Sequence, residues 1–467
     1  MRISVVTPTH DPKYIPELWR SLKRQSFANW EWVLSPSALS IDQAIARGSN
    51  PWVGAELLRI TADERVKTFV YPGPLGNVGA AKLWAFSHAT GDVLVEVDHD
   101  DLLAPNALSE VARAFEDDAT GFAYSDCFDW SPSGQLVTYH EPARRAAWEQ
   151  EGWRFAQTDV PWPFDKPNRA ETVTFPVSFE PGAHMISTIF RAPNHLRAWR
   201  ASVYRALGGH DPSLKVCDDA ELLIRTYLAT RMKRIPEVLY AYRVDGTNTW
   251  LGKIDAIREK SFQLQEQYLH RLVEREMTLR GLPLVDLGGG LNTPMGWAPA
   301  DVRFRAVPGV PCSPFPPDEC RDIFTPAEMR GPMGVDLAHR PWPFADSSVG
   351  AFRAFDFLEH IFNKLDTMRE IYRCLAPGGW LLSFTPSAAG PGAYRDPTHL
   401  SYHVADGFRY YTERELAQYL PHDPNDRENP RFMAVRLHES GDPLPYITAD
   451  LVSLKDDDGS IPGPRRI

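Results

Sequence analysis

The chain has 467 residues, with 50 basic and 61 acidic side chains and a formal net charge of -11. At about 150 residues per domain, this length predicts two or three domains. The hydrophobic fraction of 43% and the charged fraction of 24% are typical of globular proteins, which excludes a disordered chain and a coiled coil. The acidic balance argues against nucleic acid as the main partner, because nucleic-acid binders usually carry a basic face.

The five cysteines are scattered and none forms a C-x-x-C pair, which favours a reducing compartment. The first residues lack the apolar centre of a signal peptide, and no run of about 18 apolar residues follows anywhere. We therefore expect a cytoplasmic protein without a membrane span.

Strands and helices alternate over the first hundred residues. Short apolar runs predict strands over 3–7, 30–34, 66–70 and 93–97, and helical spacing predicts helices after Ile15, over 79–89 with a cap at Gly91, and after Pro105. Such alternation predicts a parallel sheet, whose ligands bind beyond the carboxyl ends of the strands. Asp98, Asp100 and Asp101 lie at such an end.

The middle of the chain separates two regions of this kind. Residues 130–183 are rich in Pro and Trp and too long for an ordinary connection, which predicts an irregular functional segment. Residues 254–280 have the pattern of one amphipathic helix, which ends at Gly281. The sequence thus predicts a first domain over 1–250, a linking helix over 251–281, a second domain over 282–455 and a flexible tail over 456–467.

The second region begins with a strand over 284–287 and a run of three glycines. Further strands are predicted over 349–355 and 380–384, with a helix over 365–375 between them. Two late runs, 431–438 and 446–454, predict an antiparallel edge. The fold class expected for the whole chain is therefore α/β, with two Rossmann-like domains.

Asp98, Asp100 and Asp101 indicate a metal–nucleotide site, because converging carboxylates repel each other unless a hard cation neutralises them. Mg²⁺ or Mn²⁺ bound by oxygen ligands also binds diphosphate. The alternative is an Asp-rich turn that caps the helix after Pro105.

Four blocks of the sequence carry a resemblance to a known family. They read VVTPTHDPKYIPELWRSLKRQSFANWEWVL, GNVGAAKLWAFSHATGDVLVEVDHDDLLAPNAL, RASVYRALGGHDPSLKVCDDAELLIR and IPEVLYAYRVDG. In this order they resemble the family 2 glycosyltransferases of GT-A fold. The resemblance implies a nucleotide-sugar donor, a divalent metal ion and inversion at the anomeric carbon.

The resemblance also implies roles for individual residues. The donor site would comprise Pro8, Thr9, Asp63, Arg65, Asn77, Gly79, Lys82 and Asp98, with Lys82 facing phosphate. The metal ligands would be Asp98, Asp100 and Asp245, the last at a place where the family often has histidine. Asp219 would be the general base beside Asp218, although acids here would also suit a helix N-terminus. His184 and His195 are interpreted as structural.

Two stretches of the second region carry another resemblance. VDLAHRPWPFADSSVGAFRAFDFLEHI and MREIYRCLAPGGWLLSFTPS resemble class I S-adenosylmethionine-dependent methyltransferases. The resemblance implies a cofactor site formed by Asp286, Gly288, Gly290, Asp301, Asp336 and Leu337. The methyl acceptor would lie beside Glu359 and His360.

The second domain departs from that family where Pro294 and Pro299 exclude a long helix after the glycines. The alternative is a degenerate copy that binds the acceptor or forms a dimer. Asp396, His399 and His403 could be metal ligands, but neither their spacing nor companion ligands specify a site, so they are interpreted as part of a polar loop over the pocket. A glycan, a protein and a lipid-linked glycan all stay open as the acceptor, and no oligomeric state is predicted.

Overall fold

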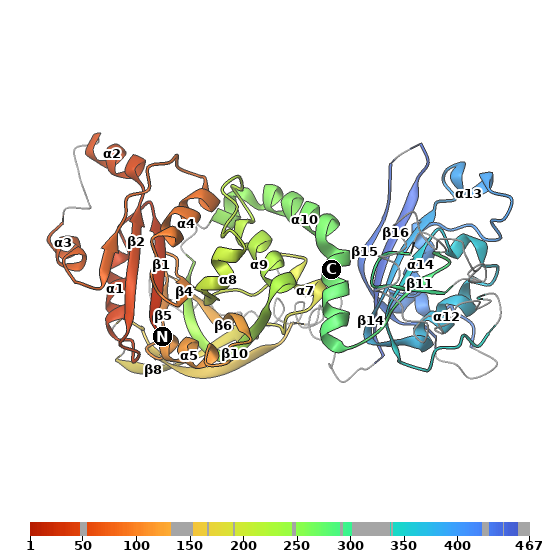
Figure 1. Cartoon of the computed structure of the whole chain (residues 1–467), viewed down its shortest axis with the longest axis horizontal. Helices are drawn as coiled ribbons and strands as arrows, with labels where there is room; N and C mark the ends of the chain where they lie inside the picture. The colour runs from red at the N-terminus through yellow and green to blue at the C-terminus, as the bar shows by residue number, and fades with distance from the viewer. Residues whose placement is uncertain are drawn as a thin grey trace, which may run out of the picture. The chain divides into compact units, whose positions relative to one another are not determined.

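The computed structural model describes residues 1–46, 54–131, 153–165, 168–189, 192–244, 249–289, 293–300, 337, 340–422, 429–441 and 443–455. The chain divides into two compact units, Met1–Leu272 and Val273–Ile467 (Figure 1). The long helix α10 (Thr249–Arg280) contains the point of division. The predicted tail over 456–467 lies outside the described residues.

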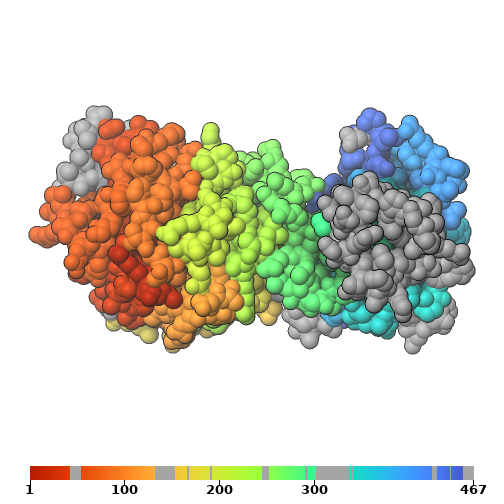
Figure 2. All heavy atoms as spheres, in the orientation of Figure 1, coloured from red at the N-terminus to blue at the C-terminus, as the bar shows by residue number. Residues whose placement is uncertain are grey.

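The first unit is built on an eight-stranded mixed sheet with the order β3-β2-β1-β4-β9-β6-β10-β5. β1 pairs in parallel with both β2 and β4, so these strands end at the same edge. β9 lies antiparallel between β4 and β6, and segments near residue 200 therefore lie beside the first hundred residues (Figure 2). The strands are β1 (Ile3–Thr9), β2 (Trp30–Pro36), β3 (Val66–Thr68), β4 (Val93–Glu96), β5 (Leu102–Leu103), β6 (Thr120–Trp130), β9 (Arg197–Arg200) and β10 (Arg231–Arg243).

Helices pack on this sheet through the apolar positions that the sequence predicts. α1 buries Ile15, Leu18 and Leu22, and a proline in its first turn suits the helical backbone. α4 ends at Ser87, so the predicted cap at Gly91 is wrong. The helices are α1 (Ile15–Lys23), α2 (Ala38–Ala46), α3 (Ala55–Thr61), α4 (Val78–Ser87), α5 (Ala107–Ala114), α7 (Ala183–Ile186), α8 (Ala201–Ala206) and α9 (Asp218–Ala229).

Gly91 instead allows close packing against β1. A Cβ atom at Gly91 would lie 2.7 Å from Ser4 Oγ, so only glycine fits there without a shift. The glycine is thus required by a neighbouring strand and not by the preceding helix.

The predicted irregular segment over 130–183 contains a regular hairpin, which corrects that expectation. β7 (Phe155–Trp162) and β8 (Arg169–Pro176) pair antiparallel in a separate two-stranded sheet. Trp162 is buried against Phe128 and Trp130. Prolines are tolerated in these strands because both strands are edges.

The second unit has a six-stranded sheet with the order β12-β11-β13-β14-β16-β15. β11 pairs in parallel with β12 on one side and with β13 on the other, and β13 pairs in parallel with β14. β16 is antiparallel to β14 and to β15, which confirms the predicted antiparallel edge. The strands are β11 (Leu284–Leu287), β12 (Ala298–Ala300), β13 (Val349–Phe355), β14 (Leu375–Pro386), β15 (Phe432–Glu439) and β16 (Tyr446–Ser453).

Short helices follow the strands of this second sheet. They are the 3₁₀ turn η4 (Leu358–His360) and the helices α12 (Lys364–Cys374), α13 (Gly392–Arg395), α14 (Ala405–Arg409) and α15 (Arg414–Ala417). The two α/β units confirm the predicted fold class. Among the described residues, no helix is both long and apolar enough to cross a membrane.

Candidate active site

The loop after β4 brings the predicted metal-binding aspartates to the carboxyl edge of the first sheet. Val97 continues the parallel pairing by donating its backbone amide to Val6 O on β1 at 3.1 Å. Asp98 follows directly. The parallel register therefore brings three of the predicted donor-site residues to one edge: Pro8, Thr9 and Asp98.

Asp101 anchors this loop. Its carboxylate is buried and accepts hydrogen bonds from the Tyr240 hydroxyl and the Arg243 backbone amide, both at 2.7 Å. Burial raises the pKa of Asp101 well above its ordinary value, and the charge of Asp100 adds to the rise. Both of these partners belong to β10, so Asp101 fixes the loop to that strand and has a structural role.

Asp98 and Asp100 remain partly accessible, with 35% and 25% of their side chains exposed. Among the described residues, the ion pairs of these two carboxylates go to histidines, His195 at 3.7 Å from Asp98 and His99 at 3.9 Å from Asp100. Burial and the charge of Asp98 raise the pKa of Asp100. Two accessible carboxylates form an oxygen donor set that fits a hard divalent ion.

Arg243 supports the same loop from the last position of β10. Its guanidinium group lies between the rings of Tyr14 and Trp130, with 3.8 Å and 3.9 Å from its central carbon to the ring centres. It donates to Asp100 O and to the Glu17 carboxylate, both at 2.6 Å. These contacts fix the backbone of the loop and leave the Asp100 carboxylate free to bind.

Lys82 lies in a buried network of charges. Its ammonium nitrogen is 2.5 Å from Glu96 Oε1 and 3.5 Å from Asp218 Oδ2. Burial alone would lower the pKa of Lys82, but the charges of Asp218 and Glu96 raise it well above the ordinary value. Burial raises the pKa of Asp218 to about 6 in spite of Lys82. The ammonium group of Lys82, which the sequence predicts to contact phosphate, thus lies between two carboxylates.

Asp219 stands beside Asp218 at the start of α9 and has 22% of its side chain exposed. Arg197 donates to its Oδ2 at 2.8 Å, and the Ala220 amide donates to Oδ1 at 2.8 Å. Burial alone would raise the pKa of Asp219, but the charges of Arg197 and Lys82 hold it below the ordinary value. Asp219 is therefore an oriented and ionised carboxylate, as a general base requires.

Two buried histidines complete the network. His195 stacks on Tyr240 with 4.8 Å between ring centres, and its Nε2 faces Asp98 at 3.7 Å. His210 lies with Nε2 at 3.9 Å from Asp218. Burial lowers the pKa of His195 to about 4 and that of His210 to about 3, so both rings are neutral at pH 7.

Sequence reasoning missed Glu96, Arg197 and His210 as members of this site. Glu96 had a signal, because a single charge inside a buried run of valines requires a partner. Arg197 and His210 had no signal in the sequence, since their partners come from other elements. The ring of His195, interpreted from the sequence as structural, faces the predicted metal ligand Asp98.

Asn77 and Gly79 shape the start of α4. Asn77 Oδ1 caps the helix by accepting the Ala80 amide at 3.2 Å, and its amide group donates to Pro212 O at 2.9 Å. A Cβ atom at Gly79 would lie 2.1 Å from Asp211 O. This glycine thus allows the segment before α9 to pack on α4, which places Lys82 beside Asp218.

The structure does not bring Asp63 and Arg65 to this site. Arg65 holds the Asp63 carboxylate through two hydrogen bonds of 3.0 and 3.1 Å and lies over the Trp30 ring. Both residues precede β3, and Trp30 opens β2. The pair therefore lies at the amino edge of the parallel strands, opposite Asp98.

In the second unit, the glycine turn follows β11 at the carboxyl edge. Gly288 has φ +69°, and a Cβ atom there would lie 2.8 Å from the Phe357 ring. Asp286 is fully buried and accepts Arg353 Nη1 at 2.9 and 3.0 Å. The chain order reverses between β11 and β13, where open α/β sheets bind ligands. Gly288 lies in the turn at this point, whereas the buried Asp286 supports the turn.

The remaining predicted residues of this unit separate into two groups. Leu337 is buried and accepts the Trp342 indole N–H at 3.1 Å. Glu359 and His360 lie in η4, just after β13, where the methyl acceptor was predicted. Three predicted ligands of this unit lie outside the described residues, Gly290, Asp301 and Asp336, and so does Asp245 of the first unit.

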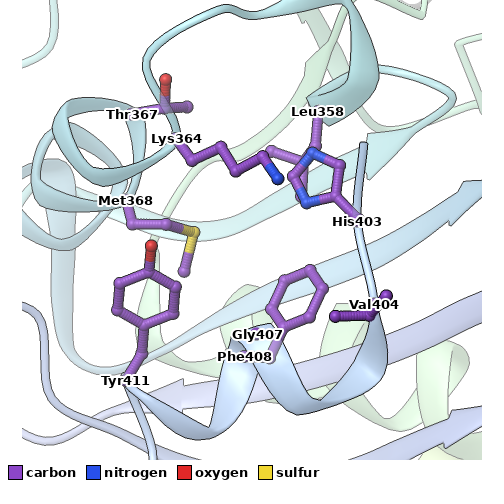
Figure 3. A pocket seen from close by; sticks show the side chains of 9 residues that line it. All are labelled: Leu358, Lys364, Thr367, Met368, His403, Val404, Gly407, Phe408 and Tyr411. Atoms are coloured by element: carbon purple, nitrogen blue, oxygen red, sulfur yellow. The ribbon is translucent and has the colours of Figure 1, made fainter. Parts of the chain in front are cut away.

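A small cavity of about 70 Å³ lies beside α12 and α14 (Figure 3). The Lys364 side chain extends toward the ring of His403, and burial together with this charge lowers the pKa of His403 to about 4. Ligand pockets usually measure about 300–1,000 Å³, so this cavity is too small for a nucleotide cofactor. It is lined by Leu358, Lys364, Thr367, Met368, His403, Val404, Gly407, Phe408 and Tyr411.

Comparison with known proteins gives a different family match for each of the two units. Residues 4–164 match the family model described as glycosyl transferase family 2, and residues 330–383 match a methyltransferase domain. An uncharacterized protein, y4gI, of Sinorhizobium fredii is 32% identical over 116 residues, which are 24% of this chain and 12% of that protein. The O-antigen biosynthesis protein RfbC of Myxococcus xanthus is 31% identical over 149 residues, which are 28% of this chain and 11% of that protein.

The chain thus spans only about an eighth of the length of these curated relatives. Among solved structures, TarS 1–349 of S. aureus in complex with UDP-GlcNAc has a TM-score of 0.39 and 15% identity. The match covers 60% of this chain and 73% of that one. The family models thus match glycosyl transferase family 2 over residues 4–164 of the first unit and a methyltransferase domain over residues 330–383 of the second.

Proposed function

We propose that the first unit transfers a sugar from a nucleotide-sugar donor to an acceptor hydroxyl, with inversion and with Mn²⁺ or Mg²⁺ as cofactor. The observation that carries the proposal is the placement of two accessible aspartates, Asp98 and Asp100, in one electrostatic network with Asp219. Arg197 interacts with both Asp98 and Asp219, and so does Lys82. A donor diphosphate on the aspartates would thus lie near the base.

Asp219 is the base of the proposed reaction. Its partly exposed carboxylate accepts the proton of the acceptor hydroxyl while that oxygen forms a bond to the anomeric carbon. The bond from this carbon to the diphosphate oxygen breaks on the opposite face, and the electron pair leaves with the nucleoside diphosphate. Attack from the opposite face inverts the anomeric configuration. Arg197 keeps Asp219 ionised and oriented.

The leaving diphosphate needs positive charge. A divalent ion held by Asp98 and Asp100 would supply most of it when bound. Lys82 stays a predicted phosphate contact, and its ammonium group also neutralises Glu96 and Asp218. Because the network holds Asp218 behind Lys82, with 6% of its side chain exposed, we assign Asp218 a positioning role.

The decisive test is donor hydrolysis and sugar transfer by Asp100→Asn and Asp219→Asn variants. We expect each to lose at least about 100-fold in rate, the usual scale for a positioned base or charge. Only Asp100→Asn should also weaken the response to Mn²⁺. Asp118→Asn changes a fully exposed aspartate and serves as the control. Near-normal turnover in Asp219→Asn would reject Asp219 as the base.

For the second unit, we propose binding of S-adenosylmethionine at the turn after β11 and methylation of the sugar or the acceptor. The match of residues 330–383 to a methyltransferase domain and the turn at Gly288 support this proposal. When bound, the cofactor supplies an electrophilic methyl group. The alternative is that this unit only binds the acceptor or forms a dimer.

Calorimetric titration with S-adenosylhomocysteine separates these two functions. We expect micromolar binding to the whole chain, and its loss in Asp336→Ala and in Gly288→Val. Valine would strain the backbone at φ +69° and collide with Phe357. No binding at millimolar ligand would favour the acceptor-binding or dimerisation module.

A further inference from the structure

Two short segments of the second unit bring a glutamate and two histidines together. Glu359 and His360 lie in η4 at the carboxyl end of β13, and His399 follows α13. One carboxylate oxygen of Glu359 and one nitrogen of each ring lie within 4.8 Å of one another. Three such atoms at this spacing can surround one metal ion after small side-chain rotations.

Hydrogen bonds hold the two segments together. The backbone oxygen of Glu359 accepts the amides of Leu400 at 2.7 Å and Ser401 at 2.9 Å. The Ser401 hydroxyl also donates to Leu358 O at 3.0 Å. The ligand-bearing backbone is therefore preorganised, which lowers the entropy lost on binding.

The partners of both rings select the tautomer that a metal requires. His399 Nδ1 lies 2.8 Å from Ala393 O, and His360 Nδ1 lies 3.2 Å from Thr398 O. A carbonyl oxygen can only accept. The Thr398 hydroxyl, which also lies 3.1 Å from His360 Nδ1, already donates to Asp396 Oδ1 at 2.6 Å, so Nδ1 carries the proton in each ring. Nε2 of a neutral imidazole then keeps its lone pair. Histidines that ligate metals commonly have their second nitrogen fixed in this way.

The carboxylate of Glu359 offers one of its two oxygens to a ligand. Its side chain is buried, and Oε2 accepts the Thr385 hydroxyl at 2.7 Å. Oε1 is also buried, and it has no hydrogen-bond partner among the described residues. A buried carboxylate oxygen without a partner is costly, and a cation would compensate for it.

We propose that Glu359, His360 and His399 bind one divalent transition-metal ion of the zinc type. Two imidazoles and one carboxylate form the donor set that such ions prefer, whereas Mg²⁺ prefers oxygen ligands alone. Three protein ligands leave one position open. Both rings are partly exposed, so this position is accessible to a small oxygen donor, either water or an alcohol.

The test is calorimetric titration of the metal-stripped whole chain with Zn²⁺ in excess Mg²⁺, which occupies the oxygen site at Asp98 and Asp100. We expect one equivalent of Zn²⁺ to bind tightly. His360→Ala, His399→Ala and Glu359→Gln should each weaken it at least about 100-fold. Thr385→Val should weaken it about 10-fold, because the hydroxyl only orients the carboxylate.

His422→Ala is the matched control, since His422 is an exposed histidine of the same unit. It should bind Zn²⁺ as the unmodified chain does. Circular dichroism verifies folding, and Thr385→Val and Glu359→Gln keep the test valid if a histidine variant unfolds. The inference fails if no equivalent binds in excess Mg²⁺, if both histidine variants bind normally, or if only Asp100→Asn abolishes binding.

Discussion

The carboxyl edges of the two sheets differ in how their charges are balanced. In the first unit, Lys82 and Arg197 neutralise three carboxylates: the buried Glu96 and Asp218 and the partly exposed Asp219. In the second unit, Arg353 forms an ion pair with Asp286, and Glu359 has no lysine or arginine partner among the described residues. Two histidines approach Glu359 instead.

The difference shows that the carboxyl edge of an α/β sheet provides the position of a site, and that the side chains at this edge determine which ligand the site suits. The first edge combines accessible carboxylates with Asp219, the proposed base, which suits a hard ion and a diphosphate. The second combines imidazoles with a single carboxylate, which suits a softer ion. The following variants test the comparison, from the largest expected effect to the smallest.

Arg197→Met should have the largest effect, because it removes the cation that serves both Asp219 and Glu96. We expect transfer to fall at least about 100-fold and the free energy of unfolding to fall by about 3–5 kcal/mol, since buried carboxylates lose their partner. Without Arg197 the pKa of Asp219 rises, so the acidic limb of the rate–pH profile should move to higher pH.

Arg200→Met is the control on the same strand, because Arg200 bonds to backbone oxygens of Thr120 and Phe115 and not to the site. It should leave the acidic limb in place. An acidic limb that does not move in Arg197→Met would show that Arg197 does not govern the base.

Arg353→Leu should destabilise the second unit by about 3 kcal/mol, because it removes the guanidinium group that neutralises the buried Asp286 carboxylate. The double variant Asp286→Asn with Arg353→Leu should recover much of this free energy, as measured by chemical denaturation. Donor hydrolysis by the first unit should stay unchanged in both. A loss of hydrolysis without a loss of stability would contradict the structural role of the pair.

His403→Gln should have the smallest effect at neutral pH, and one that depends on pH. Burial lowers the pKa of His403 to about 4 from the ordinary value of 6.5. As the pH falls from 6.5 toward 4, the unfolded chain binds a proton that the folded chain does not, so stability falls. The contribution is at most about 1.4 kcal/mol per pH unit.

The measurement is the free energy of unfolding of the unmodified chain and the His403→Gln variant at several pH values in this range. The difference between the two should shrink as the pH falls. Equal slopes in both proteins would mean that His403 titrates normally in the folded state.

Local patterns predicted most of the elements. Residues 349–355 were predicted as a strand and form β13, and the helix predicted over 365–375 is α12 (Lys364–Cys374). The hairpin of β7 and β8 was not predicted, because its prolines break the alternation and its burial depends on Phe128 and Trp130 from β6. Periodicity reveals a buried face only where the chain repeats regularly.

The candidate site was predicted in part. The motif around Asp98 and Asp100 and the pair at Asp218 and Asp219 could be read from the sequence, and the structure brings them into one network. In the structure, Asp101 accepts hydrogen bonds from β10 and anchors its loop, and Asp63 lies at the opposite edge of the sheet from Asp98. Adjacent aspartates look alike in sequence, and only their partners distinguish a ligand from an anchor.

The sequence by itself determined the α/β class, the order of most strands and helices, and the segments that carry the acidic motifs. These properties depend on neighbours within a few residues, through side-chain period and turn chemistry. The tertiary structure alone decided that Lys82 meets Asp218, that Arg197 orients Asp219 and that Glu359 meets His399. Electrostatic and ligand contacts act over a few ångströms in space, whatever the distance along the chain.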